Sequence, residues 1–186
     1  MSKTKFLQQS FKNFNEMGSV IRSGPQMCKK MTQYIPSDKD LTIVEFGAGD
    51  GAITEYILKR MSPSSKLIVF EINTEMADVV KVRFSKEAHR ITIFNEGAQN
   101  AKVKLEEIHL EAVDMIISAI PFMMLPEKLM HEILAVAKKI LKEEGSFIQM
   151  HYSLQLKNVY EKLFNKVETS FVPLNIPPGY VLKCSK

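Results

Sequence analysis

The chain of 186 residues is 45% hydrophobic and 25% charged, an ordinary globular composition that suits one domain with a substantial core. It has no apolar run of about 18 residues that would span a membrane and no apolar N-terminal segment followed by a cleavage site. We therefore expect a single domain over residues 1–186 that remains in the cytoplasm. Cys28 and Cys184 stand far apart without CxxC spacing, which argues against a zinc site and a disulfide framework.

The net charge of +4 is concentrated at one end of the chain. Residues 1–31 carry six basic side chains and one acidic side chain, whereas the remainder carries 19 basic and 20 acidic ones. A protein that grips nucleic acid usually has a basic surface over its main domain. The distribution argues against a nucleic-acid partner and indicates a docking segment at the N-terminus.

The N-terminal stretch KTKFLQQSFKNFNEM has the pattern of an amphipathic helix. Leu7, Phe11 and Phe14 follow an i, i+4, i+7 spacing, and the stretch also carries three lysines. Such a helix either lies on an anionic membrane surface or packs its aromatic stripe on the domain. We expect residues 1–35 to form this helix and a lid over the ligand-binding side of the domain.

From residue 42 onward, short β-branched runs alternate with helix-length amphipathic segments. This alternation is typical of an α/β domain, and it predicts a seven-stranded, mostly parallel sheet with helices on both faces and an N-terminal helical extension. The expected strands are 42–46, 66–71, 91–94, 113–118, 146–151, 167–172 and 180–184. The clearest helix is expected to begin near Pro126 and to end at Gly145.

The loop EFGAGDG follows the first expected strand and has glycine at every second position. Open α/β sheets bind ligands at the carboxyl ends of their strands, where this loop lies. The second strand ends in Glu71, whose carboxylate can accept both hydroxyl hydrogens of a ribose. Taken alone, the glycine loop could be a purely structural turn, and Glu71 could be a solvated charge at a strand end. The loop and Glu71 together predict a binding site for a nucleoside cofactor.

These residues resemble the class I methyltransferases that use S-adenosylmethionine (SAM). Their motif E/D-x-G-x-G-x-G matches EFGAGDG, and their acidic second-strand end matches Glu71. The resemblance implies a three-layer Rossmann-like fold and SAM as the cofactor. Acidic Glu45 and Asp50 also suit a sulfonium better than the phosphates of NAD. The cofactor-binding residues that the resemblance implies are Glu45, Gly47, Gly49, Gly51, Glu71, Ile72, Gly97, Ala98 and Ser118.

One element of the family pattern is altered after the third strand. Such enzymes often carry an Asp for the adenine amino group, as in GDA, whereas this chain reads NEGAQNA with Gly97 in that place. Three alternatives remain for adenine recognition: Glu96, Gln99, or the backbone of Gly97 and Ala98.

The fourth strand ends in SAIP, where amino-methylating members of the fold hold the acceptor nitrogen. The segment is similar to the N-L-P-[YF] of rRNA adenine dimethyltransferases, but Ser118 lacks the amide that would hold a base.

A second resemblance, to bacterial phospholipid N-methyltransferases, covers nearly the whole chain. Its four pieces are MGSVIRSG, SAIP, QMHY and NIPPGYV, in the family's order. Gly97 and Arg22, which stands where the family has a proline, depart from the pattern. The resemblance implies methyl transfer to the amino headgroup of a phosphatidylethanolamine-like lipid at the inner membrane surface. The alternatives are an RNA or small-molecule N-methyltransferase and a non-catalytic SAM-binding or membrane-docking module.

Such a reaction is a direct displacement that needs no metal, and the four histidines form no ligand cluster. His151 and Tyr152 cannot both enter the cleft, because consecutive strand residues point to opposite faces. The family pattern favours Tyr152, which would orient the amine and stabilise the methylammonium by cation–π contact. His151 is the rival, as a proton acceptor. Ser118 would lie at the acceptor position, and Tyr180 and Phe122 are candidate walls.

Overall fold

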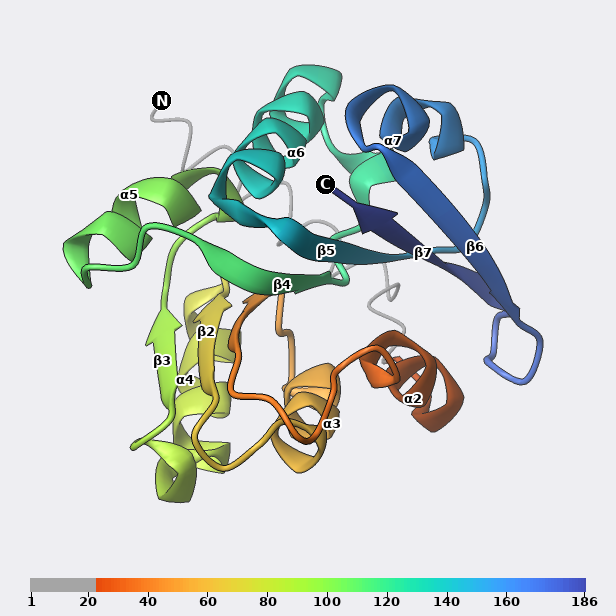
Figure 1. Ribbon diagram of the computed structural model, residues 1–186. Coiled ribbons are helices and arrows are strands. Elements are labelled where there is room, and N and C mark those ends of the chain that lie inside the picture. Colours follow the sequence, from red (N-terminus) through yellow and green to blue (C-terminus); the bar gives the residue numbers. More distant parts are fainter. Residues whose placement is uncertain (1–22) are drawn as a thin grey trace.

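The computed structural model describes residues 23–186, which form a seven-stranded sheet between two layers of helices (Figure 1). The strands are β1 (Thr42–Phe46), β2 (Lys66–Phe70), β3 (Ile91–Phe94), β4 (Val113–Ser118), β5 (Leu141–His151), β6 (Lys166–Val172) and β7 (Gly179–Ser185). The helices are α2 (Pro25–Thr32), α3 (Ala52–Arg60), α4 (Thr74–Arg83), α5 (Ala101–Glu107), α6 (Glu127–Ile140) and α7 (Lys157–Leu163). Short 3-10 turns are η1 (Ser85–Glu87), η2 (Ala98–Asn100) and η3 (Phe122–Met124).

The strand order is β3-β2-β1-β4-β5-β7-β6, and β7 runs in the direction opposite to the other six strands. The predicted mostly parallel sheet of seven strands is therefore confirmed. The order reverses between β1 and β4, so the loops after these strands leave toward opposite faces of the sheet. This reversal creates the crevice in which open α/β sheets bind their ligands.

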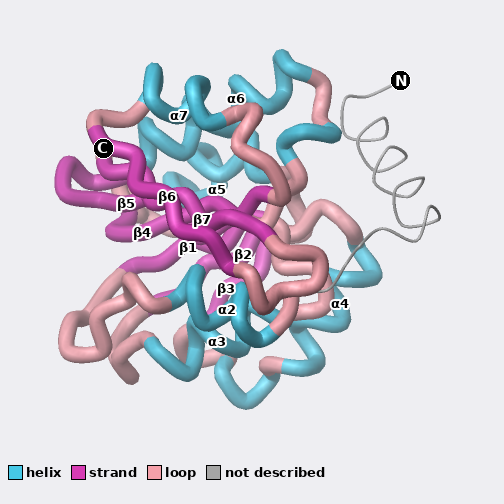
Figure 2. The backbone as a smooth tube through the Cα atoms, turned by 90° about the vertical axis from the view of Figure 1, so that its right-hand side faces the viewer, coloured by secondary structure: helices cyan, strands magenta, loops and turns pink. Residues whose placement is uncertain are grey.

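Helices cover both faces of the sheet, as Figure 2 shows, with α2, α3 and α4 on one side and α5, α6 and α7 on the other. The strands are apolar on both faces because each face meets a helical layer. Ile43 belongs to the core under α3, for example, whereas its neighbour Val44 belongs to the core under α6. The α6 stripe that fills its side of the core consists of Met130, Ile133, Leu134, Ala137 and Ile140.

The predicted boundary between the sixth helix and the fifth strand is wrong. The helix ends at Ile140 instead of Gly145, and β5 begins at Leu141, which pairs with Val113. The register then shifts before Ser146 pairs with Met115, so residues 142–145 form an irregularity in the strand. A Cβ at Gly145 would lie 2.8 Å from the Lys142 carbonyl oxygen, so the backbone packs closely there. Glycine serves this bulge and does not cap a helix.

The expected N-terminal helix and lid, residues 1–35, is described by the structure only from residue 23 onward. The amphipathic pattern of Leu7, Phe11 and Phe14 lies outside the described residues. The described part of the expected 1–35 segment contains α2, whose Met27 and Met31 are fully buried against the sheet. Cys28 and Cys184 are both buried, and no disulfide joins them.

Candidate active site

The glycine loop makes a left-handed turn from β1 into α3. Gly47, Gly49 and Gly51 all have positive φ, at 76°, 55° and 83°. A Cβ at Gly51 would lie 2.6 Å from the Phe84 ring, so the loop also passes close to the residue that follows α4. A Cβ at Gly49 would meet nothing within 4 Å. Gly49 therefore turns an open backbone surface outward, which leaves room for a ligand.

Glu71 ties this loop to the end of β2. Its Oε2 accepts a hydrogen bond from the Gly49 amide at 2.8 Å, and its Oε1 accepts one from the Asn73 amide at 2.8 Å. The side chain is 6% exposed, and burial raises its pKa. Both oxygens retain a second lone pair, so the carboxylate can still accept hydrogens from a ligand.

Glu45 places a second carboxyl group beside the loop, on the face of β1 that α3 covers. Its Oε2 accepts a hydrogen bond from the Thr54 hydroxyl at 2.7 Å, whereas its buried Oε1 has no partner. Burial raises the pKa of Glu45 to about 8; the Thr54 hydrogen bond opposes the shift and the nearby Glu71 adds to it. Glu45 is therefore largely protonated at neutral pH, and a cation bound beside it would favour its ionised form. Two acidic side chains beside the open surface at Gly49 suit a ligand that carries a positive charge, such as a sulfonium.

The segment after β3 places the two candidate side chains for adenine recognition, Glu96 and Gln99, in different surroundings. A Cβ at Gly97 would lie 2.4 Å from the Gln99 Oε1, so the Gln99 amide fills the space beside Gly97. Glu96 instead accepts a hydrogen bond from the side-chain Nδ2 of Asn100 at 2.9 Å. Of the two candidate side chains, Gln99 is the one that covers the position of the missing Asp.

Asn95 joins the ends of the second and third strands. Its side-chain amide donates to the carbonyl oxygens of Glu71 at 2.9 Å and Ile72 at 3.2 Å. The bonds fix the backbone of Ile72 relative to the segment that carries Gly97 and Ala98.

The Gln149 side chain holds the loop after β4, a contact that the sequence pattern did not predict. The Gln149 Nε2 donates to the Ile120 carbonyl oxygen at 3.0 Å and to the Met150 carbonyl oxygen at 2.7 Å. The Ser118 hydroxyl accepts a hydrogen bond from the Ile120 amide at 3.3 Å. Ser118 and Gln149 are both fully buried, and the Gln149 Oε1 has no partner. The sequence signal that could have indicated this role is that Gln149 is the first residue of the QMHY motif.

His151 and Tyr152 have different surroundings at the end of β5. The His151 Nε2 lies 2.8 Å from the Tyr160 hydroxyl, the side chain is 4% exposed, and burial lowers its pKa to about 4. The ring of Phe122 is 6.4 Å from the His151 ring. Tyr152 is 44% exposed, and partial burial raises its pKa. His151 is thus enclosed on the α7 side, whereas Tyr152 remains accessible.

The NIPPGYV segment, which leads into β7, lies close to Tyr152 and to the described end of MGSVIRSG. Gly179 lies against Tyr152, since a Cβ there would be 3.5 Å from the Tyr152 Cδ1. The Gly24 amide donates to the Asn175 side-chain oxygen at 3.2 Å, and the Ser23 hydroxyl donates to the Met150 sulfur at 3.5 Å. The described end of MGSVIRSG therefore meets both QMHY and NIPPGYV.

Tyr180 and Phe122 pack into the other side of the sheet. Tyr180 pairs with His151 across the two strands, and its ring centroid is 5.1 Å from that of Phe171. Phe122 is 1% exposed. Neither ring is grouped with Tyr152.

Over residues 23–186, no three His, Cys, Asp or Glu side chains are grouped closely enough to hold a metal ion. No helix in the same range is long and apolar enough to cross a membrane.

The doubly wound sheet, the left-handed glycine turn at its switch point and the acidic end of β2 define a class I SAM-dependent methyltransferase. Residues 43–145 match the methyltransferase domain family, and the chain belongs to it. SAM is its cofactor.

The similarity to individual relatives covers more of the chain than this domain match. The chain is 27% identical to an ornithine lipid N-methyltransferase of Singulisphaera acidiphila, over 96% of this chain and 93% of the relative. It is 26% identical to ribosomal RNA small subunit methyltransferase A of Thermotoga petrophila, over 84% of this chain and 62% of that protein.

Solved structures share the fold at low sequence identity. The 1,6-didemethyltoxoflavin-N1-methyltransferase of Burkholderia thailandensis, solved with S-adenosylhomocysteine, has a TM-score of 0.75 at 11% identity, covering 100% of this chain and 91% of its own. A SAM-dependent O-methyltransferase of Thermotoga maritima has a TM-score of 0.67 at 15% identity, and the match covers 95% of this chain and 71% of that enzyme.

Proposed function

We propose that this protein is a SAM-dependent N-methyltransferase that acts on the amino headgroup of a phosphatidylethanolamine-like lipid at the inner surface of the membrane. The observation that carries the proposal is the accessible Tyr152 at the end of β5, flanked by the contacts of Gly24 with Asn175 and by Gly179. The similarity to an ornithine lipid N-methyltransferase over nearly both whole chains supports a lipid amine as the methyl acceptor.

The proposed cofactor site follows the turn after β1 and the ends of β2 and β3. Gly47, Gly49 and Gly51 would receive the methionine part of SAM, because their left-handed backbone leaves an open surface there. Glu71 would accept hydrogens from the ribose, and the carboxyl group of Glu45 would favour the cationic end of the ligand.

The adenine part of this proposed site lies between the segments after β2 and β3. Ile72 would pack against the ring, the backbone of Gly97 and Ala98 would line its edge, and the Gln99 amide would meet its amino group.

SAM supplies an electrophilic methyl group on a sulfonium, and the chain must bring an unprotonated amine in line with it. We assign the acceptor contact to Tyr152, whose ring and hydroxyl would face the amine and favour the methylammonium as charge develops. The buried Ser118 and the Ile120 carbonyl, which Gln149 fixes, would border the acceptor position.

The amine must lose a proton before or during transfer. His151 does not suit this task, because its Nε2 is engaged with Tyr160 and burial holds its pKa near 4. We propose that the proton passes to water at the open side of Tyr152, and that His151 instead positions the end of β5. Phe122 and Tyr180 would act as walls behind this strand end.

The test is transfer of radiolabel from methyl-labelled SAM to a total bacterial lipid extract, with a bacterial RNA fraction in a parallel reaction. Label in the lipid phase, lost in a folded Gly49→Asp variant, is the expected result, and thin-layer separation then identifies the headgroup. Label found only in RNA or in a small soluble acceptor would move the assignment to those substrates. No transfer despite SAM binding would indicate a non-catalytic module.

A further inference from the structure

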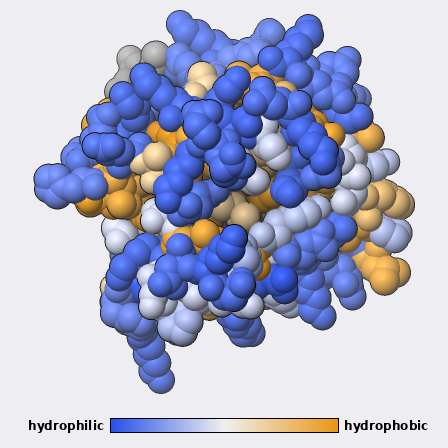
Figure 3. Space-filling view, in the orientation of Figure 1, coloured by the Kyte–Doolittle hydropathy of each residue, from blue (hydrophilic) through white to orange (hydrophobic). Residues whose placement is uncertain are grey.

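Exposed hydrophobic side chains gather at the edge of the sheet that carries the proposed active site. Of the ten large hydrophobic side chains that are exposed within residues 23–186, seven lie after β4, after β5, or around the turn from β6 to β7. These seven are Met123, Met124, Tyr152, Leu154, Phe171, Leu174 and Ile176. Figure 3 shows hydrophobic surface at the lower right, where the β6–β7 loop lies in Figure 1. Apolar side chains concentrated on one side of a soluble fold mark an interaction surface.

The most exposed of these residues lie on the β6–β7 loop, residues 173–178. Leu174 is 75% exposed and Ile176 is 87% exposed. The loop is nevertheless anchored, because Asn175 is buried, accepts a hydrogen bond from the Gly24 amide and donates one to the Pro177 carbonyl oxygen at 2.7 Å. An anchored loop that holds two aliphatic side chains in solvent is suited to insertion into an apolar phase.

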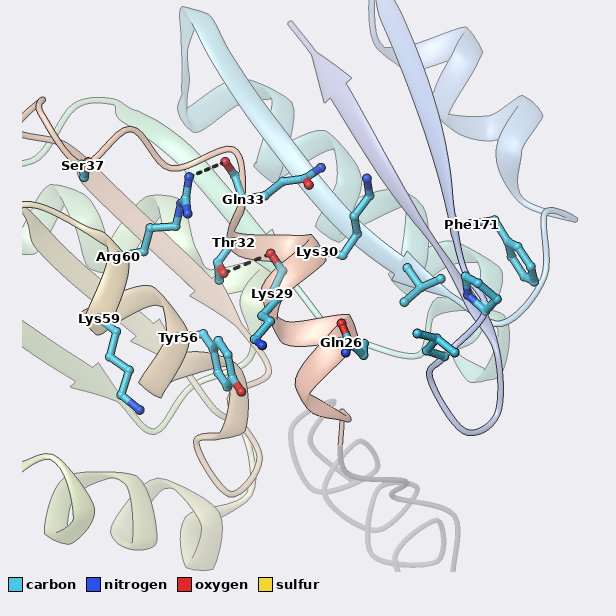
Figure 4. Close-up of a pocket in the computed structure, with 13 residues that line it drawn as sticks. Gln26, Lys29, Lys30, Thr32, Gln33, Ser37, Tyr56, Lys59, Arg60 and Phe171 are labelled. Atoms are coloured by element: carbon cyan, nitrogen blue, oxygen red, sulfur yellow. Dashed lines mark hydrogen bonds between the residues drawn. The ribbon is translucent and has the colours of Figure 1, made fainter.

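A basic groove of about 820 Å³ adjoins this loop (Figure 4). Its lining includes Lys29 and Lys30 of α2, Lys59 and Arg60 of α3, and Leu174, but no acidic side chain. The groove shares no lining residue with the proposed SAM site, so it is a separate feature of the surface.

The four cations of the groove differ in their engagement. Lys59 forms an ion pair with Glu55 at 2.5 Å, and Arg60 donates to the carbonyl oxygens of Gln33 and Ile35. No ion pair joins Lys29 or Lys30 to a carboxylate of residues 23–186. These two lysines are the groove cations best placed to meet external phosphates.

The loop connects the groove to the acceptor side of the active site. Residues 171–174 line the groove, whereas Gly179 lies against Tyr152 and against Met27 of α2. A surface that engages the loop therefore also lies next to Tyr152.

We propose that the β6–β7 loop and the α2 lysines form a docking face for an anionic phospholipid bilayer. Leu174 and Ile176 enter the acyl boundary, while Lys29 and Lys30 meet lipid phosphates. This inference rests on the proposed function, because the docking face would serve to bring lipid headgroups to Tyr152. Exposed aliphatic side chains beside cations favour a bilayer over RNA, which binds through cations and stacked aromatic rings.

The experiment measures sedimentation of the full-length protein with vesicles of equal parts phosphatidylglycerol and phosphatidylcholine, and with pure phosphatidylcholine vesicles. Neither lipid carries a primary amine, so docking is measured without methyl transfer. The test variants are Leu174→Ser/Ile176→Ser and Lys29→Gln/Lys30→Gln. The matched control is Val82→Ser/Lys86→Gln, which removes an exposed aliphatic and a cation near the far end of α4.

We expect the wild type to prefer the anionic vesicles and each test variant to lose about tenfold in partitioning. The control should match the wild type, and all proteins should bind S-adenosylhomocysteine equally. Unchanged partitioning of both test variants would overturn the docking face, as would equal binding to neutral vesicles or a preference for an RNA fraction. Docking without methylation of any lipid would contradict the proposed function alone, and lipid methylation with unaltered docking of the variants would contradict this inference alone.

Discussion

The Glu71 carboxylate accepts a hydrogen bond from the Gly49 amide, so the acidic end of β2 holds the left-handed turn that follows β1. The two residues lie 22 positions apart in sequence. Their bond makes the two signals of the family motif a single structural unit: changing the acid also changes the backbone that would face the cofactor.

Replacing Glu71 with Gln should weaken cofactor binding. The amide retains one acceptor but cannot accept at both backbone N–H groups and also serve two ribose hydroxyls. We expect an affinity loss of about tenfold for S-adenosylhomocysteine in isothermal titration calorimetry. Glu75→Gln, on the exposed first turn of α4, is the matched control. An affinity equal to that of the wild type would show that Glu71 is a purely structural residue.

Gln99 should contribute to recognition of the adenine ring. Its amide covers Gly97, where the family often carries Asp. Gln99→Ala should lower affinity for S-adenosylhomocysteine about fivefold, the effect of one hydrogen bond, while leaving affinity for an analogue that lacks the adenine amino group unchanged. Equal losses for both ligands would place the contact elsewhere.

Gln149 should act through the loop that borders the acceptor. Gln149→Leu removes the hydrogen bonds to the Ile120 and Met150 carbonyl oxygens. The Phe122 amide still donates to the Ile120 oxygen, so we expect the fold to lose about 1 kcal/mol of stability. Because the loop would then shift, we expect kcat to fall while the SAM dissociation constant changes little. Denaturant unfolding and single-turnover kinetics measure the two effects. A loss of stability with unaltered kcat would restrict Gln149 to a structural role.

His151 should make the fold sensitive to acid. Its pKa is about 4 in the folded protein and 6.5 in the unfolded chain, so between these values the unfolded chain binds a proton that the folded protein does not. Stability should therefore fall as the pH is lowered from 6.5 toward 4, by about 3 kcal/mol for the full shift.

The measurement for this prediction is urea unfolding at pH 7 and pH 4.5. His151→Leu should be less stable than the wild type at pH 7, because Tyr160 loses its partner, but should lose less stability on acidification. His89→Gln, at an exposed position, is the control. An acid sensitivity that is the same in wild type and His151→Leu would contradict the assignment.

Most strands were predictable because each is a short apolar run between helical segments. The first, third and fourth strands match the expected ranges, and the second differs only in that Glu71 follows its last residue. The start of β5 was not predictable, because the apolar spacing of α6 continues through Leu141 although that residue pairs with Val113. Local periodicity cannot distinguish a last helical turn from a first strand residue when both are buried.

The candidate site shows the same division between local and tertiary information. The sequence motif identified Glu45 and Glu71, but not the buried state that raises the pKa of both. It likewise did not indicate the clamp of Gln149 on Ile120, which depends on the side-by-side pairing of β4 and β5. Such contacts join residues far apart in sequence, so they cannot be predicted from the spacing of residues along the chain.

The most direct test of the lipid N-methyltransferase assignment is the kinetics of methyl transfer from SAM to phosphatidylethanolamine in mixed vesicles, for wild type and Tyr152→Ala. We predict measurable transfer by the wild type and a decrease in kcat/KM of about thirtyfold in the variant, from the lost ring and hydroxyl contacts, with unchanged affinity for S-adenosylhomocysteine. Absence of transfer by a wild-type protein that binds SAM, or equal rates for both proteins, would contradict the account.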